Sequence, residues 1–183
     1  MREKRALSMR RMAHIALMAV VICLCAWLTV PFAVPFTMQT FAVFFILALL
    51  DGKRATASII IYVLLGAVGI PVFSGFGSGL GILLGTTGGY IIGFIFMGLI
   101  YMLIMHFLPK KQWAKATALI IGLIVCYAFG TCWFMFVYAK NVGPVGLVSA
   151  LTWCVIPFII PDIIKLALAL TLADRLKGVL RSE

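Results

Sequence analysis

Long apolar blocks, separated by short polar segments, dominate this chain of 183 residues. Six such blocks stand out, at about residues 12–30, 37–50, 55–71, 86–108, 114–138 and 149–174. Within each block the apolar residues are continuous and do not alternate with polar ones, which favours helices over the strands of a membrane barrel. The block at 37–50 is short for a full span and is expected to be tilted, interrupted or in a locally thin region. The pattern predicts an all-α integral membrane protein with six transmembrane helices.

The composition agrees with a membrane protein, because 64% of the residues are hydrophobic and only 11% are charged. A soluble domain of this size needs a more polar surface. The net charge of +10 comes mainly from basic residues in alternate polar segments, at 1–11, 53–54, 110–115 and 175–183. The positive-inside rule therefore predicts one multi-pass domain, residues 1–183, in the cytoplasmic membrane, with the basic N-terminus (1–11) and the tail (175–183) both inside. This topology accounts for the charge without a nucleic-acid partner and leaves membrane lipid as the surroundings.

Two opposite charges, Asp162 and Lys165, interrupt the otherwise uncharged stretch from Asn141 to Ala173. At a spacing of three residues they lie on one face of a helix, one turn apart. Ionisable groups inside a bilayer are costly and generally mark a substrate or ion pathway. The alternative is a structural ion pair that fixes helix packing.

Two prolines before this pair predict where the last helix begins. Pro157 and Pro161 interrupt the apolar block, and proline is tolerated in the first turn of a helix but breaks its interior. We therefore expect a short outer element over residues 146–160 and a last helix that begins near Pro161. Asp162 would then lie in the first turn, where the helix dipole favours a carboxylate, and on the outer side of the membrane.

A glycine-rich connection, from Gly69 to Tyr90, carries eight of the chain's 17 glycines. It follows the third predicted helix, precedes the fourth and is expected on the outer side. A flexible linker would combine glycine with serine and charge, whereas this segment interleaves glycine with bulky residues such as Phe73 and Phe76. Irregular backbone at membrane depth must be buried in protein or line a cavity. The segment is either a lid over a ligand or a glycine cluster that lets helices pack.

Gln39 lies near the end of a second outer loop, residues 30–40, at the start of an apolar helix, and its amide can donate to and accept from an amide-like ligand. A helix-start residue that faces water is the equal alternative. The chain has no HExxH, GxSxG or GxxxxGK[ST] motif, so we expect no enzyme, and an ATP-driven step would need an ATPase on another chain. Its five cysteines form no CxxC pair and have no nearby histidine at metal-ligand spacing, which predicts inert thiols and no metal site.

The first apolar block follows basic residues, as in a signal peptide, but it lacks a convincing small-x-small cleavage site. We interpret it as the first membrane helix. Ala13, Ala16 and Ala19 give this helix a small-residue face, and small side chains let a partner helix approach closely in lipid. This face is the predicted docking surface for a partner.

Three segments resemble the signature segments of the BioY-type biotin transporters: VPFTMQT at 34–40, GIPVFSGFGSGLGILLGTTGGYIIGF at 69–94 and PDIIK at 161–165. The resemblance runs along essentially the whole chain, and the glycine segment ending in TGGY is its most specific part. It implies a substrate-binding S component of an energy-coupling factor transporter, built as a six-helix bundle that holds the vitamin near the outer face under its loops. The implied partners are biotin as substrate, a transmembrane coupling protein and two cytoplasmic ATPases, with no cofactor.

The resemblance also implies that Asp162 and Lys165 hold the biotin head group. Biotin offers two ureido N–H donors, a ureido carbonyl, an apolar thiolane ring and a carboxylate. Asp162 can accept a ureido N–H, and Lys165 can donate to the ureido carbonyl or to the carboxylate. The predicted substrate-binding residues are Gln39, Phe73, Gly75, Gly88, Gly89, Tyr90, Asp162 and Lys165.

Two other functions stay open on the sequence alone. One is a membrane interaction subunit whose Asp–Lys pair is purely structural and which transports nothing. The other is a proton-coupled carrier of another vitamin-like solute that uses Asp162, although the chain shows no relay of carboxylates or histidines along its apolar blocks.

Overall fold

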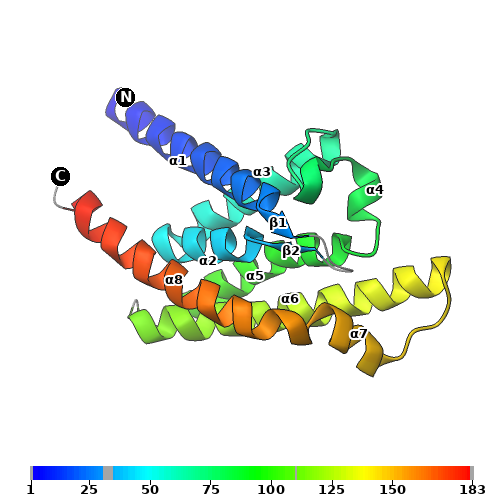
Figure 1. Cartoon of the computed structure of the whole chain (residues 1–183). Coiled ribbons are helices and arrows are strands. Elements are labelled where there is room, and N and C mark those ends of the chain that lie inside the picture. The colour runs from blue at the N-terminus through cyan, green and yellow to red at the C-terminus, as the bar shows by residue number, and fades with distance from the viewer. Residues whose placement is uncertain (1, 31–34, 110, 182–183) are drawn as a thin grey trace.

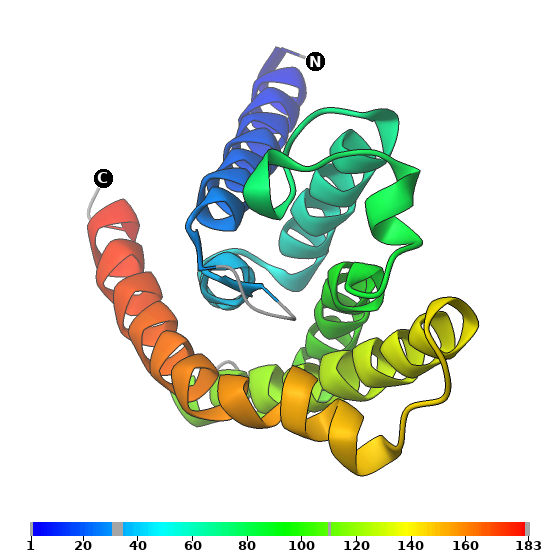
Figure 2. The same ribbon diagram turned by 45° about the vertical axis from the view of Figure 1, so that its right-hand side comes forward.

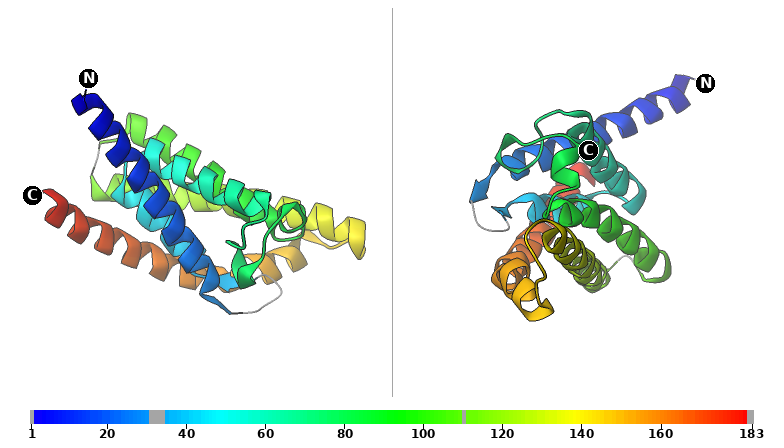
Figure 3. Two further views of the ribbon diagram at one scale, coloured as in Figure 1. Left: turned by 90° about the horizontal axis from the view of Figure 1, so that it is seen from above. Right: turned by 90° about the vertical axis from the view of Figure 1, so that its right-hand side faces the viewer.

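The computed structural model describes residues 2–30, 35–109 and 111–181, most of which are helical (Figure 1). In chain order the elements are α1 (Arg2–Trp27), β1 (Thr29–Val30), β2 (Phe36–Thr37), α2 (Gln39–Leu49), α3 (Gly52–Val68), the 3₁₀ helix η1 (Ser74–Phe76), α4 (Leu80–Leu83), α5 (Gly88–Phe107), α6 (Gln112–Asn141), α7 (Leu147–Cys154) and α8 (Ile156–Arg181). The start of α1 and the end of α8 lie at one end of the molecule, here called the terminal end (Figures 1 and 3). The short helix α4 and the connection between α6 and α7 lie at the opposite end, the loop end.

Four helical stretches are long and apolar enough to cross a membrane: Met9–Trp27, Gly88–Phe107, Gln112–Asn141 and Leu147–Lys177. The structure thus agrees with a mainly helical membrane protein. The apolar blocks at 37–50 and 55–71 become α2 and α3, which have 11 and 17 residues. At 1.5 Å per residue α2 is about 17 Å long, roughly half the thickness of a hydrocarbon core of about 30 Å.

α2 is the central helix of the bundle. Every residue from Ala42 to Ala48 is buried, with at most 7% of its surface exposed. α2 packs against α1, α3, α5, α6 and α8, and Figure 2 shows it nearly end-on among α1, α3 and α8. A helix that is apolar all round needs apolar surroundings on every side. Neighbouring helices give α2 the environment that lipid gives to longer spans.

A two-stranded antiparallel ribbon precedes α2 and departs from the all-α prediction. Thr29 pairs with Thr37, and Val30 pairs with Phe36. Each strand has only two residues, too few for the alternating pattern that identifies a strand in a sequence. The ribbon brings Thr37 to the start of α2.

The glycine-rich connection folds back on the end of α3. Gly69, with a left-handed φ of +109°, ends α3, and the amide of Gly79 donates to the carbonyl of Gly66 at 2.7 Å. The ring of Phe73 lies so close to Gly66 that an added Cβ there would be 2.0 Å from ring atom Cζ. The connection therefore packs tightly through Phe73, while Phe76 stays 64% exposed.

The prediction for the start of the last helix was wrong. α7 ends at Cys154 and α8 begins at Ile156, so Pro161 lies inside α8 and Asp162 lies in its second turn. Pro157 is the second residue of α8, where an N–H needs no helical partner. Only Pro161 removes a backbone hydrogen bond from α8, because its nitrogen carries no hydrogen. The helix continues past this one missing bond. The helix dipole therefore does not account for the carboxylate of Asp162.

Candidate functional site

Asp162 and Lys165 form a buried ion pair on α8. Lys165 Nζ lies 2.9 Å from Asp162 Oδ1, and the side chains are only 6% and 2% exposed for the lysine and the aspartate. Charges removed from water are costly unless their remaining donors and acceptors are also paired. The surroundings of the pair therefore decide whether it is stable.

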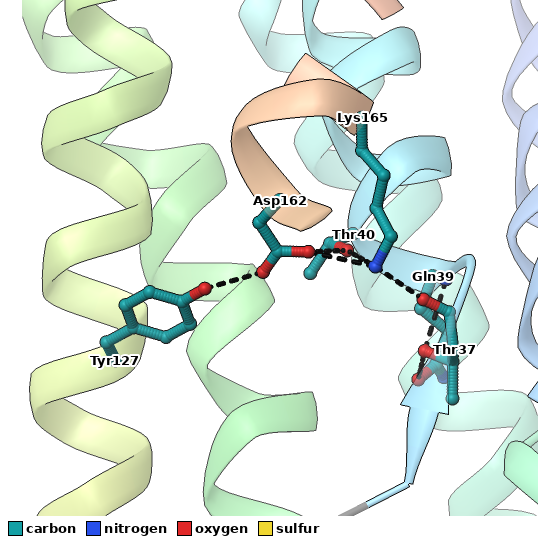
Figure 4. Close-up of polar contacts among 6 residues, drawn as sticks. All are labelled: Thr37, Gln39, Thr40, Tyr127, Asp162 and Lys165. Carbon is teal, nitrogen blue, oxygen red and sulfur yellow. Dashed lines mark hydrogen bonds and ion pairs between the residues drawn. The ribbon is translucent and has the colours of Figure 1, made fainter. Parts of the chain in front are cut away.

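Thr37, Thr40 and Tyr127 complete the hydrogen bonds of this pair (Figure 4). Thr40 Oγ1 donates to Asp162 Oδ1 at 2.8 Å and accepts from Lys165 Nζ at 3.0 Å. Tyr127 Oη donates to Asp162 Oδ2 at 2.6 Å. Lys165 Nζ also donates to the backbone carbonyl of Thr37 at 2.8 Å, so all three N–H donors of the ammonium are used.

The start of α2 holds the polar groups in place. Thr37 Oγ1 accepts from the backbone N–H of Gln39 at 3.2 Å, a local turn typical of threonine before a helix. The same hydroxyl donates to Gln39 Oε1 at 3.0 Å, and the amide nitrogen of Gln39 donates to the buried hydroxyl of Tyr62 on α3. A continuous polar network therefore links α3, the start of α2, α8 and α6 through the apolar core.

Two adjoining cavities, here called the paired cavity, lie beside this network. The smaller one, about 70 Å³, is lined by Asp162, Lys165 and Tyr127 among others. The larger one, about 270 Å³, is lined partly by the glycine-rich connection, including Phe73 and Ser74. Five residues line both: Pro35, Thr37, Gln39, Tyr90 and Phe94. The paired cavity therefore runs from the ion pair to the glycine-rich connection, and its size is near the lower end for ligand sites, about 300 Å³.

Comparison with known proteins identifies the family. The model of the BioY family matches residues 1–182. This chain belongs to the BioY family. The biotin transporter BioY of Thermotoga maritima is 35% identical over 170 residues, which cover 92% of this chain and 96% of that protein. The probable biotin transporter BioY of Pyrococcus horikoshii is 41% identical over 147 residues, which cover 79% and 82%.

A solved structure resembles this BioY family member along nearly its whole length. It is the crystal structure of the S component for biotin from an ECF-type ABC transporter, with a TM-score of 0.81 and 25% sequence identity. The match covers 94% of this chain and 93% of that chain. The helical bundle is therefore the fold of an S component.

The predicted site residues of this BioY family member fall into two groups. Those that line the paired cavity are Gln39, Phe73, Tyr90, Asp162 and Lys165. Gly75, Gly88 and Gly89 are not among the described residues that line it. A Cβ added to Gly88 would lie 1.8 Å from the carbonyl oxygen of Leu83. A Cβ added to Gly89 would lie 2.3 Å from Trp133 Cβ. Gly88 and Gly89 therefore allow close packing at the start of α5. Contact of Gly75, Gly88 and Gly89 with substrate stays a prediction.

Sequence reasoning missed Tyr127 and did not select Thr40. Tyr127 is 35 positions from Asp162 and lies in another apolar block, so no local spacing connects the two. The available signal was general: the hydroxyl of a buried tyrosine usually has a hydrogen-bond partner. Thr40 belongs to the segment at 34–40, in which only Gln39 was selected for its amide.

The three alanines of the predicted small-residue face of α1 differ in their exposure. Ala13 and Ala16 are exposed, whereas Ala19 is 1% exposed and belongs to the core. Leu17 and Val20 on the same helix are 56% and 50% exposed. The available surface for close approach is therefore the part of α1 around Ala13 and Ala16.

Within the described part of the chain, no group of three or more His, Cys, Asp or Glu side chains could hold a metal ion. The polar side chains of the site offer hydrogen bonds and one ion pair. Such a site can recognise a neutral or anionic solute with both donors and acceptors.

Proposed function

We propose that this chain binds biotin and carries it across the cytoplasmic membrane as the S component of an energy-coupling factor transporter. The observation that supports this most directly is the buried Asp162–Lys165 pair at the wall of the paired cavity. A purely structural pair needs no adjoining cavity, whereas a ligand site needs a few placed polar groups in a mainly apolar lining. The relatives named as biotin transporters indicate the substrate.

The polar groups of the paired cavity match the functional groups of biotin. Asp162 supplies an acceptor for a ureido N–H, and Lys165 supplies a donor for the ureido carbonyl or the carboxylate. The ring of Phe94 and the body of Tyr90 supply apolar surface for the thiolane. Because the pair is satisfied internally, bound biotin must take over hydrogen bonds that Thr40 or Tyr127 now make. The exchange of partners keeps both charges paired with and without ligand.

The direct test is binding of radiolabelled biotin to the purified chain without partners. We expect saturable binding to one site that unlabelled biotin displaces. No binding would contradict the proposal and favour a membrane interaction subunit. Uptake of biotin into cells with and without the ATPase module tests the proposal against a proton-coupled carrier of another solute: we expect biotin uptake that requires the module, whereas such a carrier would take up no biotin in either case.

The glycine-rich connection covers the larger part of the paired cavity in this proposal. Gly75 and Gly79 have left-handed φ values of +64° and +88°, which give the connection backbone freedom, and Phe73 anchors it. We expect amide hydrogen exchange across residues 69–90 to slow when biotin is added, because a closed cover is less open to local unfolding. Unchanged hydrogen exchange would show that the connection only lets helices pack and does not close over a ligand.

The membrane topology in this proposal has six crossings, made by α1, α2, α3, α5, α6 and α8, with both termini in the cytoplasm. The shared position of the start of α1 and the end of α8 supports an even number of crossings. α2 crosses as a short helix enclosed by protein, and three lysines, Lys53, Lys115 and Lys177, lie together at the terminal end, as the positive-inside rule expects for the cytoplasmic side. Reporter enzymes active only in the cytoplasm should work when fused to either terminus.

Energy for uptake comes, in this proposal, from a transmembrane coupling protein with two ATPases. The exposed part of α1 around Ala13 and Ala16 is the surface for it, because small side chains let helices approach closely in lipid. We expect Ala16→Trp to abolish module-dependent uptake and to leave biotin binding by the purified chain intact. Leu17→Trp, which replaces an already large exposed side chain, is the matched control and should retain uptake. Loss of binding together with uptake would show instead that the substitution disturbs the fold, and would not support docking at Ala16.

A further inference from the structure

A larger cavity, about 570 Å³, lies at the terminal end and shares none of its lining residues with the paired cavity. Its walls come from the junction of α2 and α3, the end of α5, the start of α6 and the end of α8. Three lysines line it, Lys53, Lys115 and Lys177, and Asp51 is the acidic residue of its lining. The proposed biotin site does not use this cavity.

Two lysines of this terminal cavity, Lys53 and Lys115, keep N–H donors available. Lys115 is 9% exposed and donates to Gln112 Oε1 at 3.3 Å and to Asp174 Oδ1 at 3.1 Å, which uses two of its three N–H donors. Lys177 Nζ donates to the carbonyl oxygen of Ala48 at 2.6 Å. Lys53 is exposed and forms no hydrogen bond or ion pair with the residues that the structure describes.

Tyr101 adds a neutral donor to the terminal cavity. Its side chain is 97% buried, since only 3% is exposed, and it lines the cavity. Its hydroxyl makes no hydrogen bond with any part of the chain that the structure describes. Since no fully buried side-chain N or O atom of the described residues lacks a partner, this hydroxyl is accessible from the cavity and can donate to an acceptor bound there.

The start of α3 adds backbone donors to the same wall. Asp51 occupies the N-cap position of this 17-residue helix, but its side chain makes no capping bond and pairs with Arg54 instead. The first N–H groups of a helix have no partner within it. Gly52 and Lys53 line the cavity, so these N–H groups, the lysines and Tyr101 together suit an anionic group with several acceptor oxygens, such as a phosphate.

We propose that the terminal cavity binds the phosphate of an anionic phospholipid, with the upper part of the lipid against its apolar wall. Leu49, Leu50, Met102 and Met105 form that wall beside the lysines. A headgroup phosphate with an attached apolar chain matches both parts of the lining, whereas an acidic side chain of a partner matches only the lysines. Basic pockets between membrane helices near the water interface bind such headgroups.

The test is retention of lipid by the purified full chain, measured by native mass spectrometry after exchange into phosphatidylglycerol or phosphatidylcholine. We expect one phosphatidylglycerol to remain bound and phosphatidylcholine to be lost. The variant Lys53→Gln/Tyr101→Phe should weaken phosphatidylglycerol binding about tenfold, since it removes one charged and one neutral donor. Lys111→Gln is the matched control, because Lys111 is basic and exposed near the start of α6 but does not line the cavity.

Equal retention of the two lipids, or equal losses in the double variant and the control, would overturn the proposal. Displacement of phosphatidylglycerol by excess inorganic phosphate would support recognition of the phosphate itself, whereas binding of phosphate without any lipid preference would contradict a lipid site. If lipid retention stays unchanged in the double variant but the coupling module no longer co-purifies, the cavity is a protein interface instead. Biotin binding, measured on the same samples, is expected to stay unchanged, so failure here leaves the proposed function untouched.

Discussion

α8 contributes an aspartate to two ion pairs, and these pairs differ in how far they are removed from water. Asp162 pairs with Lys165 inside the bundle, where the side chains are 2% and 6% exposed. Asp174 pairs with Lys115 of α6 at the terminal end at 3.1 Å, and their side chains are 43% and 11% exposed. Exposed pairs contribute about 0–1 kcal/mol to stability, whereas breaking a buried pair costs about 3–5 kcal/mol. The same chemistry therefore has different consequences at the two positions.

The difference also separates a candidate site from a helix contact. The Asp162–Lys165 pair, here called the inner pair because it lies inside the bundle, has partners from β2, α2 and α6 and borders the paired cavity. The Asp174–Lys115 pair, here called the outer pair because of its exposure to solvent, joins two helices and leaves nearly half of its aspartate in contact with solvent. Burial and the number of partners, more than the presence of an ion pair, distinguish the candidate site from a helix contact.

The largest effect is expected for Lys165→Met, which leaves Asp162 buried without its counter-charge. Stability should fall by about 3–5 kcal/mol, and biotin affinity by about a hundredfold or more through loss of charge-assisted hydrogen bonds. Thermal unfolding and equilibrium binding of the purified protein measure the two effects. The double variant Asp162→Asn/Lys165→Met is the matched control. It should recover most of the stability, because no unpaired charge stays buried, but not the binding. Wild-type affinity in the double variant would make the inner pair purely structural.

A smaller effect is expected for Tyr127→Phe, which removes one hydrogen bond to Asp162 Oδ2 and keeps the ring. Biotin affinity should fall about tenfold, in line with one lost bond to a charged group. Isothermal titration of the purified chain measures it. Tyr138→Phe is the control on the same helix, because its hydroxyl makes no hydrogen bond with the described residues. Equal losses in the two variants would mean that the effect comes from α6 in general.

The smallest effect is expected for Asp174→Asn in the outer pair. The exposed aspartate should contribute less than about 1 kcal/mol, and less still at high salt because its charge is screened. Unfolding at low and high ionic strength measures this contribution, and biotin affinity should not change. A loss of several kcal/mol would show that solvent exposure of Asp174 does not weaken the outer pair, and the comparison of the two pairs would fail.

The sequence was most informative where the physics is local. Continuous apolar blocks predicted the helices, and a spacing of three residues predicted that Asp162 and Lys165 meet on one face. The proline argument failed at Pro161, because the tolerance of a helix for one missing bond depends on the packing around it. Tyr127 could not be predicted, since its approach to Asp162 depends on how α6 and α8 pack. The burial of α2 on every side is likewise a property of the whole bundle.

The position of α2 has a consequence for membrane insertion. α2 leaves the ribosome directly after α1, but α6 and α8, which cover it in the folded protein, are synthesised later. At about 17 Å it is too short to be held across the bilayer by lipid alone. During synthesis α2 therefore depends on α1 and α3, or on the insertion machinery, and the backbone carbonyl of Thr37 and the hydroxyl of Thr40 lack their partners on α8. The proposed substrate site is complete only when the last helix has entered the membrane, so we expect a chain truncated before α8 to bind no biotin.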